Sequence, residues 1–272
     1  MSPLPATSVP HQPLWLSAVS SGRFFVWNDA WGASYDWRTD TWNPIAAMGG
    51  PQLPAQYLLR GAIGTPANII YLRNNSYKTS KLANTRYEIA TDAWHPISDQ
   101  RAPSASFPAI VPTDSAVVVW GGTIAPQRAT NEGARLDLSS MTWRPITTKG
   151  APQPSSAPVG VWTGRHVFVW GVGAGSTDGG LYDPARDAWT PVSQDAAPTK
   201  KPFLAVWTGK RVIVLGQEAG GYGIYDPHHD AWHPMMPPPK SQFVFFVAQW
   251  DRCRLLAYRP SELLLYTPPA GT

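Results

Sequence analysis

Short runs of β-branched and aromatic residues recur along the chain, separated by turns rich in Gly, Asp and Pro. Residues 161–171 read as an apolar strand, a Gly turn and a second β-branched strand that ends at a Gly. Residues 205–216 repeat that order, and residues 18–27 repeat it less regularly. Runs of this length between turn residues are typical of β-strands. The pattern therefore predicts pairs of antiparallel strands throughout the chain.

A second pattern follows each of these strand pairs. It consists of an aromatic residue, a turn containing Asp and often Pro, a Trp seven residues after the aromatic residue, and then x-Pro-aliphatic. The five pairs are Tyr35/Trp42, Tyr87/Trp94, Leu136/Trp143, Tyr182/Trp189 and Tyr225/Trp232, so that only Leu136 is not aromatic. Successive Trp residues are 52, 49, 46 and 43 positions apart. A period in this range indicates a repeat architecture, and four strands per unit suit a four-stranded antiparallel blade.

These motifs resemble the Kelch repeat over nearly the whole chain. A Gly-Gly pair stands at the strand end at Gly121–Gly122, the Trp recurs, and Asp follows the lead aromatic at Asp36, Asp183 and Asp226. Several repeats depart from the Gly-Gly pair. The resemblance implies an all-β fold, a Kelch-like β-propeller of four-stranded antiparallel blades.

The chain ends suggest how the ring closes. Tyr266 occupies the lead aromatic position of a last repeat, but the chain stops at Thr272, one residue before the expected Trp. Residues 1–4 read as Trp-x-Pro-aliphatic with Met1 in the Trp position. We therefore expect six blades in a single domain, residues 1–272, with the N-terminal strand completing the last blade. The expected blades are about 14–45, 57–97, 107–146, 159–192, 202–235, and 242–272 together with 1–10.

Composition narrows the function classes. The hydrophobic fraction of 43% supports a packed core, and the net charge of +4 comes without a long Lys/Arg run. We therefore do not expect nucleic-acid binding or membrane insertion, and we expect a monomer. A single Cys excludes an internal disulfide framework and a Cys-based zinc site. The compartment stays open: cytoplasmic if Met1 is the native start, and secreted or periplasmic if a signal peptide was removed.

The longest connections between second and third strands belong to blades two and three. They run from Leu72 to Tyr87 and from Trp120 to Leu136, and they should emerge on the same face as the crossovers between blades. We expect them to form a wall beside the propeller mouth, where loops on a rigid scaffold carry binding residues. The candidate ligand-binding residues are Asn28, Asp29, Trp31, Arg73, Asn74, Tyr77, Arg128, Glu132, Lys201, Tyr222, Gln242 and Arg259.

Most of the aromatic and His residues are assigned to structure. The five repeat Trp residues and Trp27, Trp120 and Trp170 are expected to pack between blades, whereas Trp31 falls outside the repeat register and is a candidate for ligand stacking. The six His residues show no metal-ligand spacing, so no metal and no cofactor are expected. Copper radical oxidases also use Kelch propellers and need a Cys near the mouth. Cys253 instead falls at a turn on the opposite face.

Two functions are consistent with these residues. The first is a binding module that captures a small polar or anionic ligand, or a protein loop, at the mouth. Arg73 and Arg259 replace the strand-end Gly, and paired guanidiniums suit carboxylate or phosphate groups. Alternatively, these side chains pair with one another and line a wet channel. The second function is a metal-independent enzyme like the Kelch-like sialic acid mutarotases, with Glu218 or Glu262 as proton carrier.

Overall fold

The computed structural model describes residues 16–27, 31–47, 61–72, 84–124, 127–173, 177–216, 218–235, 247–251, 254–259 and 262–266. All regular secondary structure in these ranges is β-strand. The chain separates into two compact units, Met1–Gln100 and Arg101–Thr272, and each unit is described by itself. The expectation of one domain over 272 residues stays a prediction.

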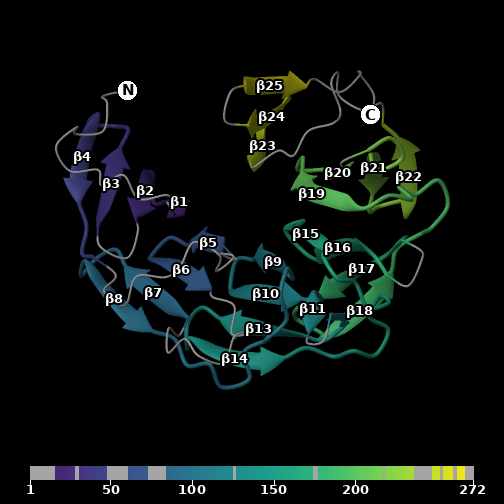
Figure 1. The fold of residues 1–272 in the computed structure, drawn as a ribbon, viewed down its shortest axis with the longest axis horizontal. Helices are drawn as coiled ribbons and strands as arrows, with labels where there is room; N and C mark the ends of the chain where they lie inside the picture. The colour runs from purple at the N-terminus through teal and green to yellow at the C-terminus, as the bar shows by residue number, and fades with distance from the viewer. Residues whose placement is uncertain are drawn as a thin grey trace. The chain divides into compact units, whose positions relative to one another are not determined.

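The first unit contains two four-stranded antiparallel sheets, each a simple meander (Figure 1). Sheet 1 consists of β1 (Leu16–Ser20), β2 (Arg23–Trp27), β3 (Gly32–Asp36) and β4 (Thr41–Pro44). Sheet 2 consists of β5 (Gly61–Gly64), β6 (Asn68–Leu72), β7 (Thr85–Glu88) and β8 (Ala93–Pro96). Their first strands, β1 and β5, lie beside each other.

The second unit contains three more four-stranded meanders, a three-stranded sheet and a small hairpin. Sheet 3 is β9 (Ala109–Pro112), β10 (Ala116–Trp120), β13 (Gly133–Asp137) and β14 (Thr142–Pro145), and the hairpin β11 (Thr123–Ile124) and β12 (Arg128–Ala129) lies between its second and third strands. Sheet 4 is β15 (Val159–Trp162), β16 (Val167–Val172), β17 (Thr177–Asp183) and β18 (Ala188–Pro191). Sheet 5 is β19 (Pro202–Trp207), β20 (Val212–Gly216), β21 (Gly223–Asp226) and β22 (Ala231–Pro234). Sheet 6 is β23 (Val247–Asp251), β24 (Arg254–Arg259) and β25 (Glu262–Tyr266).

Within the second unit, β9, β15, β19 and β23 follow one another as neighbouring first strands. The described residues thus confirm the predicted antiparallel, blade-like sheets. The expected N-terminal strand of the last blade, residues 1–10, lies outside the described residues, as does Cys253.

The seven-residue interval of the repeat has a simple origin in strand register. Tyr182 and Trp189 are directly opposite each other on β17 and β18, and the same pairing holds for the lead residue and Trp of sheets 1, 2, 3 and 5. The two rings pack at 5.0 Å between centroids in sheet 4. Each fourth strand then ends at the repeat Pro, a residue that fits where no further ladder hydrogen bond is needed.

Within each unit, the core lies between consecutive sheets, and the second strands contribute many of its buried side chains. Trp27, Trp120 and Trp170 are at most 1% exposed, and each packs against the repeat Trp of the following sheet. The centroid distances are 5.7 Å for Trp27–Trp94, 5.5 Å for Trp120–Trp189 and 4.7 Å for Trp170–Trp232. The predicted packing role of these Trp residues is therefore confirmed. Burial of large rings on this scale supplies much of the free energy that joins adjacent sheets.

A polar contact between sheets, which we name the Tyr–Asp–Trp clamp, recurs beside this core. In sheet 4 the Tyr182 hydroxyl donates to Asp187 Oδ1 at 2.7 Å, and the same oxygen accepts the backbone N–H of Thr147, just after the last strand of sheet 3, at 3.1 Å. Trp189 Nε1 donates to the carbonyl oxygen of Thr147 at 2.8 Å. Tyr87, Asp92 and Trp94 hold Ala46 in the same way, and Tyr225, Asp230 and Trp232 hold Ser193.

Sheet 3 lacks two members of the clamp. Leu136 stands in the Tyr position and Met141 in the Asp position, and the Trp143 Nε1 is buried without a hydrogen-bond partner among the described residues. Met141 nevertheless has φ 52°, close to the 50° of Asp187. The left-handed turn is therefore imposed by the hairpin itself, whichever side chain occupies it.

Candidate functional site

Seven of the twelve predicted ligand-binding residues have side chains that the structure does not describe. Arg259 belongs to β24 and pairs through its backbone with Glu262 of β25, but the two side chains are not described. The other six residues lie outside the described ranges; they are Asn28, Asp29, Arg73, Asn74, Tyr77 and Gln242. The expected convergence of Arg73 and Arg259 on one ligand stays a prediction.

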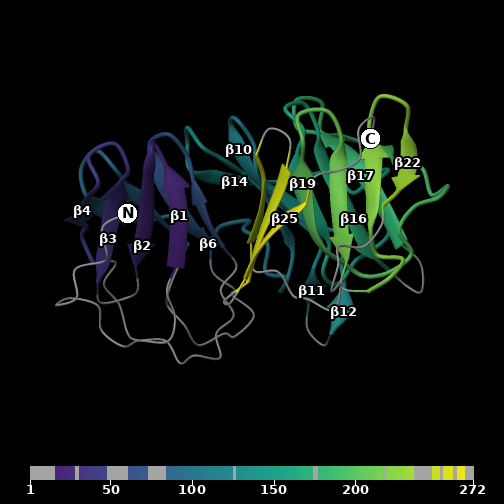
Figure 2. The same cartoon turned by 90° about the horizontal axis from the view of Figure 1, so that it is seen from above.

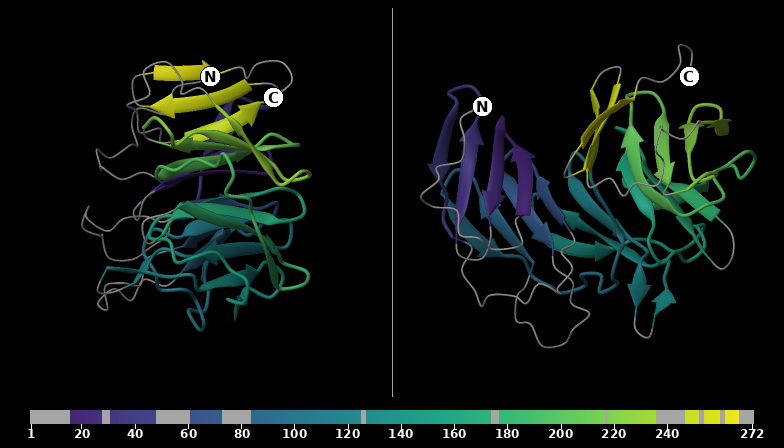
Figure 3. Two further views of the ribbon diagram at one scale, coloured as in Figure 1. Left: turned by 90° about the vertical axis from the view of Figure 1, so that its right-hand side faces the viewer. Right: turned by 45° about the horizontal axis from the view of Figure 1, so that its top comes forward.

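The predicted wall of blade three is a defined structural element in the second unit. The connection leaves β10 through Gly121 and Gly122, at φ +70° and +99°, and then forms the β11–β12 hairpin. A Cβ on Gly122 would lie 2.4 Å from the Ser106 carbonyl oxygen, so the close approach requires Gly. Figure 2 shows the hairpin extending beyond the strand ends of its own unit, and the right-hand view of Figure 3 shows the same projection.

Backbone hydrogen bonds fix this hairpin to the crossovers on both sides. Thr123 and Ser106 exchange two bonds of 2.7 Å, which join the hairpin to the crossover that enters sheet 3. On the other side Gly122 N donates to the Ser155 carbonyl at 2.8 Å, and Ser155 N donates to the Thr130 carbonyl at 3.3 Å. Ser155 belongs to the crossover that enters sheet 4. The wall is thus a rigid platform, since its backbone groups are paired at both edges.

Phe107 lies on the rim of this platform and has two unusual properties. Its side chain is 53% exposed, although Phe is normally a core residue. Its backbone has φ 53°, a left-handed conformation that is rare for a bulky residue, and Pro108 follows it. Such a conformation costs roughly 1–2 kcal/mol relative to an ordinary one. The chain therefore exposes an aromatic ring in a strained position and anchors it next to Ser106.

Arg128 and Glu132 are the predicted residues that lie on the platform. Both are exposed, and neither forms an ion pair with another described residue. Arg128 pairs with Ile124 within the hairpin, and the Glu132 carbonyl accepts the Gly121 N–H at 2.9 Å. Their backbones are fixed while their charged ends face solvent, which leaves both side chains available to a partner.

The predicted residues of blade five form a second, smaller cluster on the corresponding connections. The N–H groups of Thr199 and Lys200 donate to the Gly220 carbonyl at 2.9 and 3.3 Å, so the crossover entering sheet 5 lies against the 218–221 turn. The expectation that crossovers and second-to-third connections share a face is confirmed here. Lys201 and Glu218 are exposed.

Tyr222 and Trp31 are placed differently from the exposed residues. Tyr222 is 6% exposed and packs in an apolar cluster with Leu215 and Ile224, and this burial raises the pKa of its hydroxyl. Trp31 is half-buried and immediately precedes β3 in the first unit. Packing therefore accounts for Tyr222 more directly than ligand contact does.

Phe107 is not among the predicted site residues, because blade three is predicted to begin at about residue 107. The strand in fact begins at Ala109. The available signal was the order Ser-Phe-Pro in a crossover, since Pro restricts the backbone of the residue before it.

In the part of the chain that the structure describes, no group of three or more His, Cys, Asp or Glu side chains could hold a metal ion. No helix in those ranges is long and apolar enough to span a bilayer. A scan against protein-family models and a search of curated proteins gave no match to this chain. The site therefore has to be interpreted from its own geometry.

Proposed function

We propose that the chain forms a six-bladed, Kelch-like β-propeller closed by its N-terminal segment. The support is the repeated meander, the neighbouring first strands within each unit, and the clamp that links consecutive sheets. In every clamp the Trp bonds the residue four positions after the preceding repeat Trp.

We further propose that the protein is a binding module and that its partner is a protein loop. The observation that carries this proposal is Phe107, an exposed aromatic ring held in a strained backbone conformation on a rigid platform. Strain of this kind persists where surrounding structure over-determines it, and it clusters at binding sites. Exposed aromatic rings and Arg side chains are the residue types that dominate protein–protein interfaces.

The chemistry of the platform specifies the partner loop. Phe107 offers an apolar contact, and Arg128 offers a guanidinium without an ion-pair partner among the described residues. The complementary loop presents an apolar side chain and an Asp or Glu a few residues away. The small anionic ligand expected between Arg73 and Arg259 is a separate prediction, because those side chains are not described.

Peptide selection on the full chain tests the proposal. Clones from a random peptide display library are selected on the immobilised protein, and their affinities are measured for the wild type and for the variants Phe107→Ala and Arg128→Glu. We expect the dominant clones to pair an apolar with an acidic residue, and to lose affinity by about tenfold or more in each variant, as interface hot spots do. Clones that bind both variants as tightly as the wild type would contradict the proposal.

Two further variants distinguish specific binding at Phe107 from non-specific binding to exposed aromatic rings. Trp37 is 48% exposed in the β3–β4 turn of the first unit, so Trp37→Ala removes a comparable exposed ring and should leave affinity unchanged. Phe107→Asn introduces a residue that tolerates positive φ better than Phe does. It should therefore raise the free energy of unfolding by about 0.5–1 kcal/mol while it abolishes binding. Opposite signs for stability and binding are the signature of a residue retained for function.

A further inference from the structure

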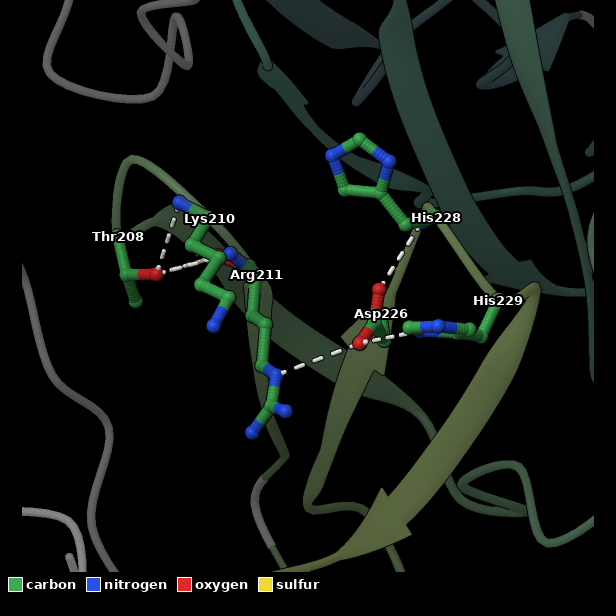
Figure 4. Close-up of polar contacts among 6 residues, drawn as sticks. All are labelled: Thr208, Lys210, Arg211, Asp226, His228 and His229. Atoms are coloured by element: carbon green, nitrogen blue, oxygen red, sulfur yellow. Dashed lines mark hydrogen bonds and ion pairs between the residues drawn. The ribbon is translucent and has the colours of Figure 1, made fainter. Parts of the chain in front are cut away.

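An ion pair recurs at the ends of the sheets that are joined by the turn between the first and second strands. A basic residue at the start of the second strand, or just before it, faces the acidic residue that follows the lead aromatic. In sheet 5 this pair is Arg211 and Asp226, with Arg211 Nε 3.6 Å from Asp226 Oδ2. Figure 4 shows the arrangement, in which His229 Nδ1 approaches the same oxygen at 3.1 Å. Arg23 and Asp36 repeat it in sheet 1 at 3.4 Å.

In this pattern the two carboxylate oxygens have different partners. Oδ1 of Asp226 accepts the backbone N–H of His228 at 2.9 Å and so holds the turn. Oδ2 receives the cation. Asp183 in sheet 4 follows the same division, since Oδ1 accepts the Ala185 N–H and Oδ2 binds Arg186 Nη1 at 2.7 Å. Each of these carboxylates is therefore neutralised on its Oδ2 side.

Sheet 3 has the carboxylate without the cation. Ala116 occupies the position of Arg211 and faces Asp137 across β10 and β13. Oδ1 of Asp137 accepts four hydrogen bonds from Ser139 and Ser140, which lower the pKa of this carboxyl to about 2. Oδ2 has no partner among the described residues. The carboxyl is thus a permanent anion at neutral pH with one unused oxygen.

A cavity of about 290 Å³ opens at this position between sheets 3 and 4. Ala116 and Asp137 form one part of its wall, and Trp162, Asp114 and Asp183 form other parts. Arg135 and Arg165 also line it, but the Arg135 Nη1 is engaged by the Pro184 carbonyl, and Arg165 is exposed at the rim. The volume is at the lower end of the range for small-molecule sites.

We infer that this cavity binds a small molecule through a guanidinium group that takes the place of the missing Arg side chain. A planar guanidinium can donate to the free Oδ2 of Asp137, as Arg211 approaches Asp226 in sheet 5. The indole of Trp162 in the same wall offers a face for a cation. This site is separate from the Phe107 platform and does not depend on the proposed function.

Agmatine, which carries a guanidinium and a primary ammonium at the two ends of a four-carbon chain, is the probe. Its binding to the full chain is measured by calorimetry and by thermal shift at constant ionic strength. The control ligand is 4-aminobutylurea, which keeps the ammonium and replaces the guanidinium by a neutral urea. We expect agmatine to raise the melting temperature of the wild type, and 4-aminobutylurea to have no effect. Asp137→Asn should weaken agmatine binding by about tenfold or more.

Ala116→Arg provides the decisive variant. Its side chain should fill the cavity, pair with Asp137 as in sheet 5, raise the melting temperature without ligand, and abolish the response to agmatine. The inference is overturned if the wild type shows no agmatine binding, if 4-aminobutylurea binds equally well, or if Asp137→Asn binds agmatine with wild-type affinity. The last comparison stands even if Ala116→Arg fails to fold.

Discussion

Sheets 3 and 4 have the same strand order, the same turn geometry and the same repeat Trp, but they differ at the other clamp positions. Sheet 4 uses Tyr182, Asp187 and Trp189 to bind both the N–H and the carbonyl of one residue, Thr147. Sheet 3 has Leu136 and Met141 in the first two positions. The comparison shows that the turn and its left-handed residue survive without the clamp. The polar residues therefore add contacts between sheets and do not shape the hairpin.

Removal of the clamp Trp should have the largest effect. Trp189 is 8% exposed, packs on Trp120 and donates to Thr147, so Trp189→Ala should lower the free energy of unfolding by about 3–5 kcal/mol. Trp31→Ala should cost far less, because Trp31 is half-buried and outside the repeat. Urea denaturation measures both. Equal destabilisation would show that the repeat Trp has no special place in the core.

Replacement of the clamp residue Asp187 should have a smaller effect on stability, and replacement of Met141, which occupies the same position in sheet 3, should not reproduce it. Asp187→Ala leaves the Tyr182 hydroxyl and the Thr147 N–H without their acceptor, so it should cost about 1–3 kcal/mol. Met141→Ala is the matched control, because it also places Ala at a left-handed position and removes no acceptor. If both variants lose the same stability, backbone strain rather than the clamp explains the effect.

The smallest effect concerns acid stability. Hydrogen bonds from Ser139 and Ser140 lower the pKa of Asp137 from 3.8 to about 2. A carboxyl whose pKa is depressed by folding contributes stability above its unfolded pKa and loses it as the pH falls through the folded pKa. The contribution should therefore fade between about pH 4 and pH 2. The double variant Ser139→Ala/Ser140→Ala should raise the Asp137 pKa, as followed by NMR titration; an unchanged pKa would exclude the serines as its cause.

Much of the fold could be predicted from the sequence because its signals are local. The Tyr182-to-Trp189 interval spans a single hairpin, and the Gly121–Gly122 pair marks a strand end, so both are visible in a short window. The packing of Trp120 and Trp170 followed from their place at the ends of β-branched runs. The blade count, the closure by residues 1–10 and the Kelch resemblance stay proposals.

The features that escaped prediction depend on contacts between distant residues. Asp187 binds Thr147, 40 positions away, and no window of one repeat shows that relation. The platform is fixed by Ser106 and Ser155, which flank the hairpin from two different crossovers. The sequence predicts Tyr222 as a loop residue, but its side chain packs in an apolar cluster of sheet 5. The enzyme alternative with Glu262 stays a prediction, because that side chain is not described.

The clamp has a consequence for how such a chain can change over evolution. Its acceptor and donor on the preceding sheet are a backbone carbonyl and a backbone N–H, supplied by Ala46, Thr147 and Ser193 in turn. Because every residue except Pro carries both groups, the joint between neighbouring repeats requires no matching side chain on one of its sides. Repeats can therefore be duplicated, exchanged or lengthened in their connections without a compensating substitution in the neighbouring repeat. The spacing of the repeat Trp residues, which shrinks from 52 to 43 positions along this chain, is the kind of variation that such a joint permits.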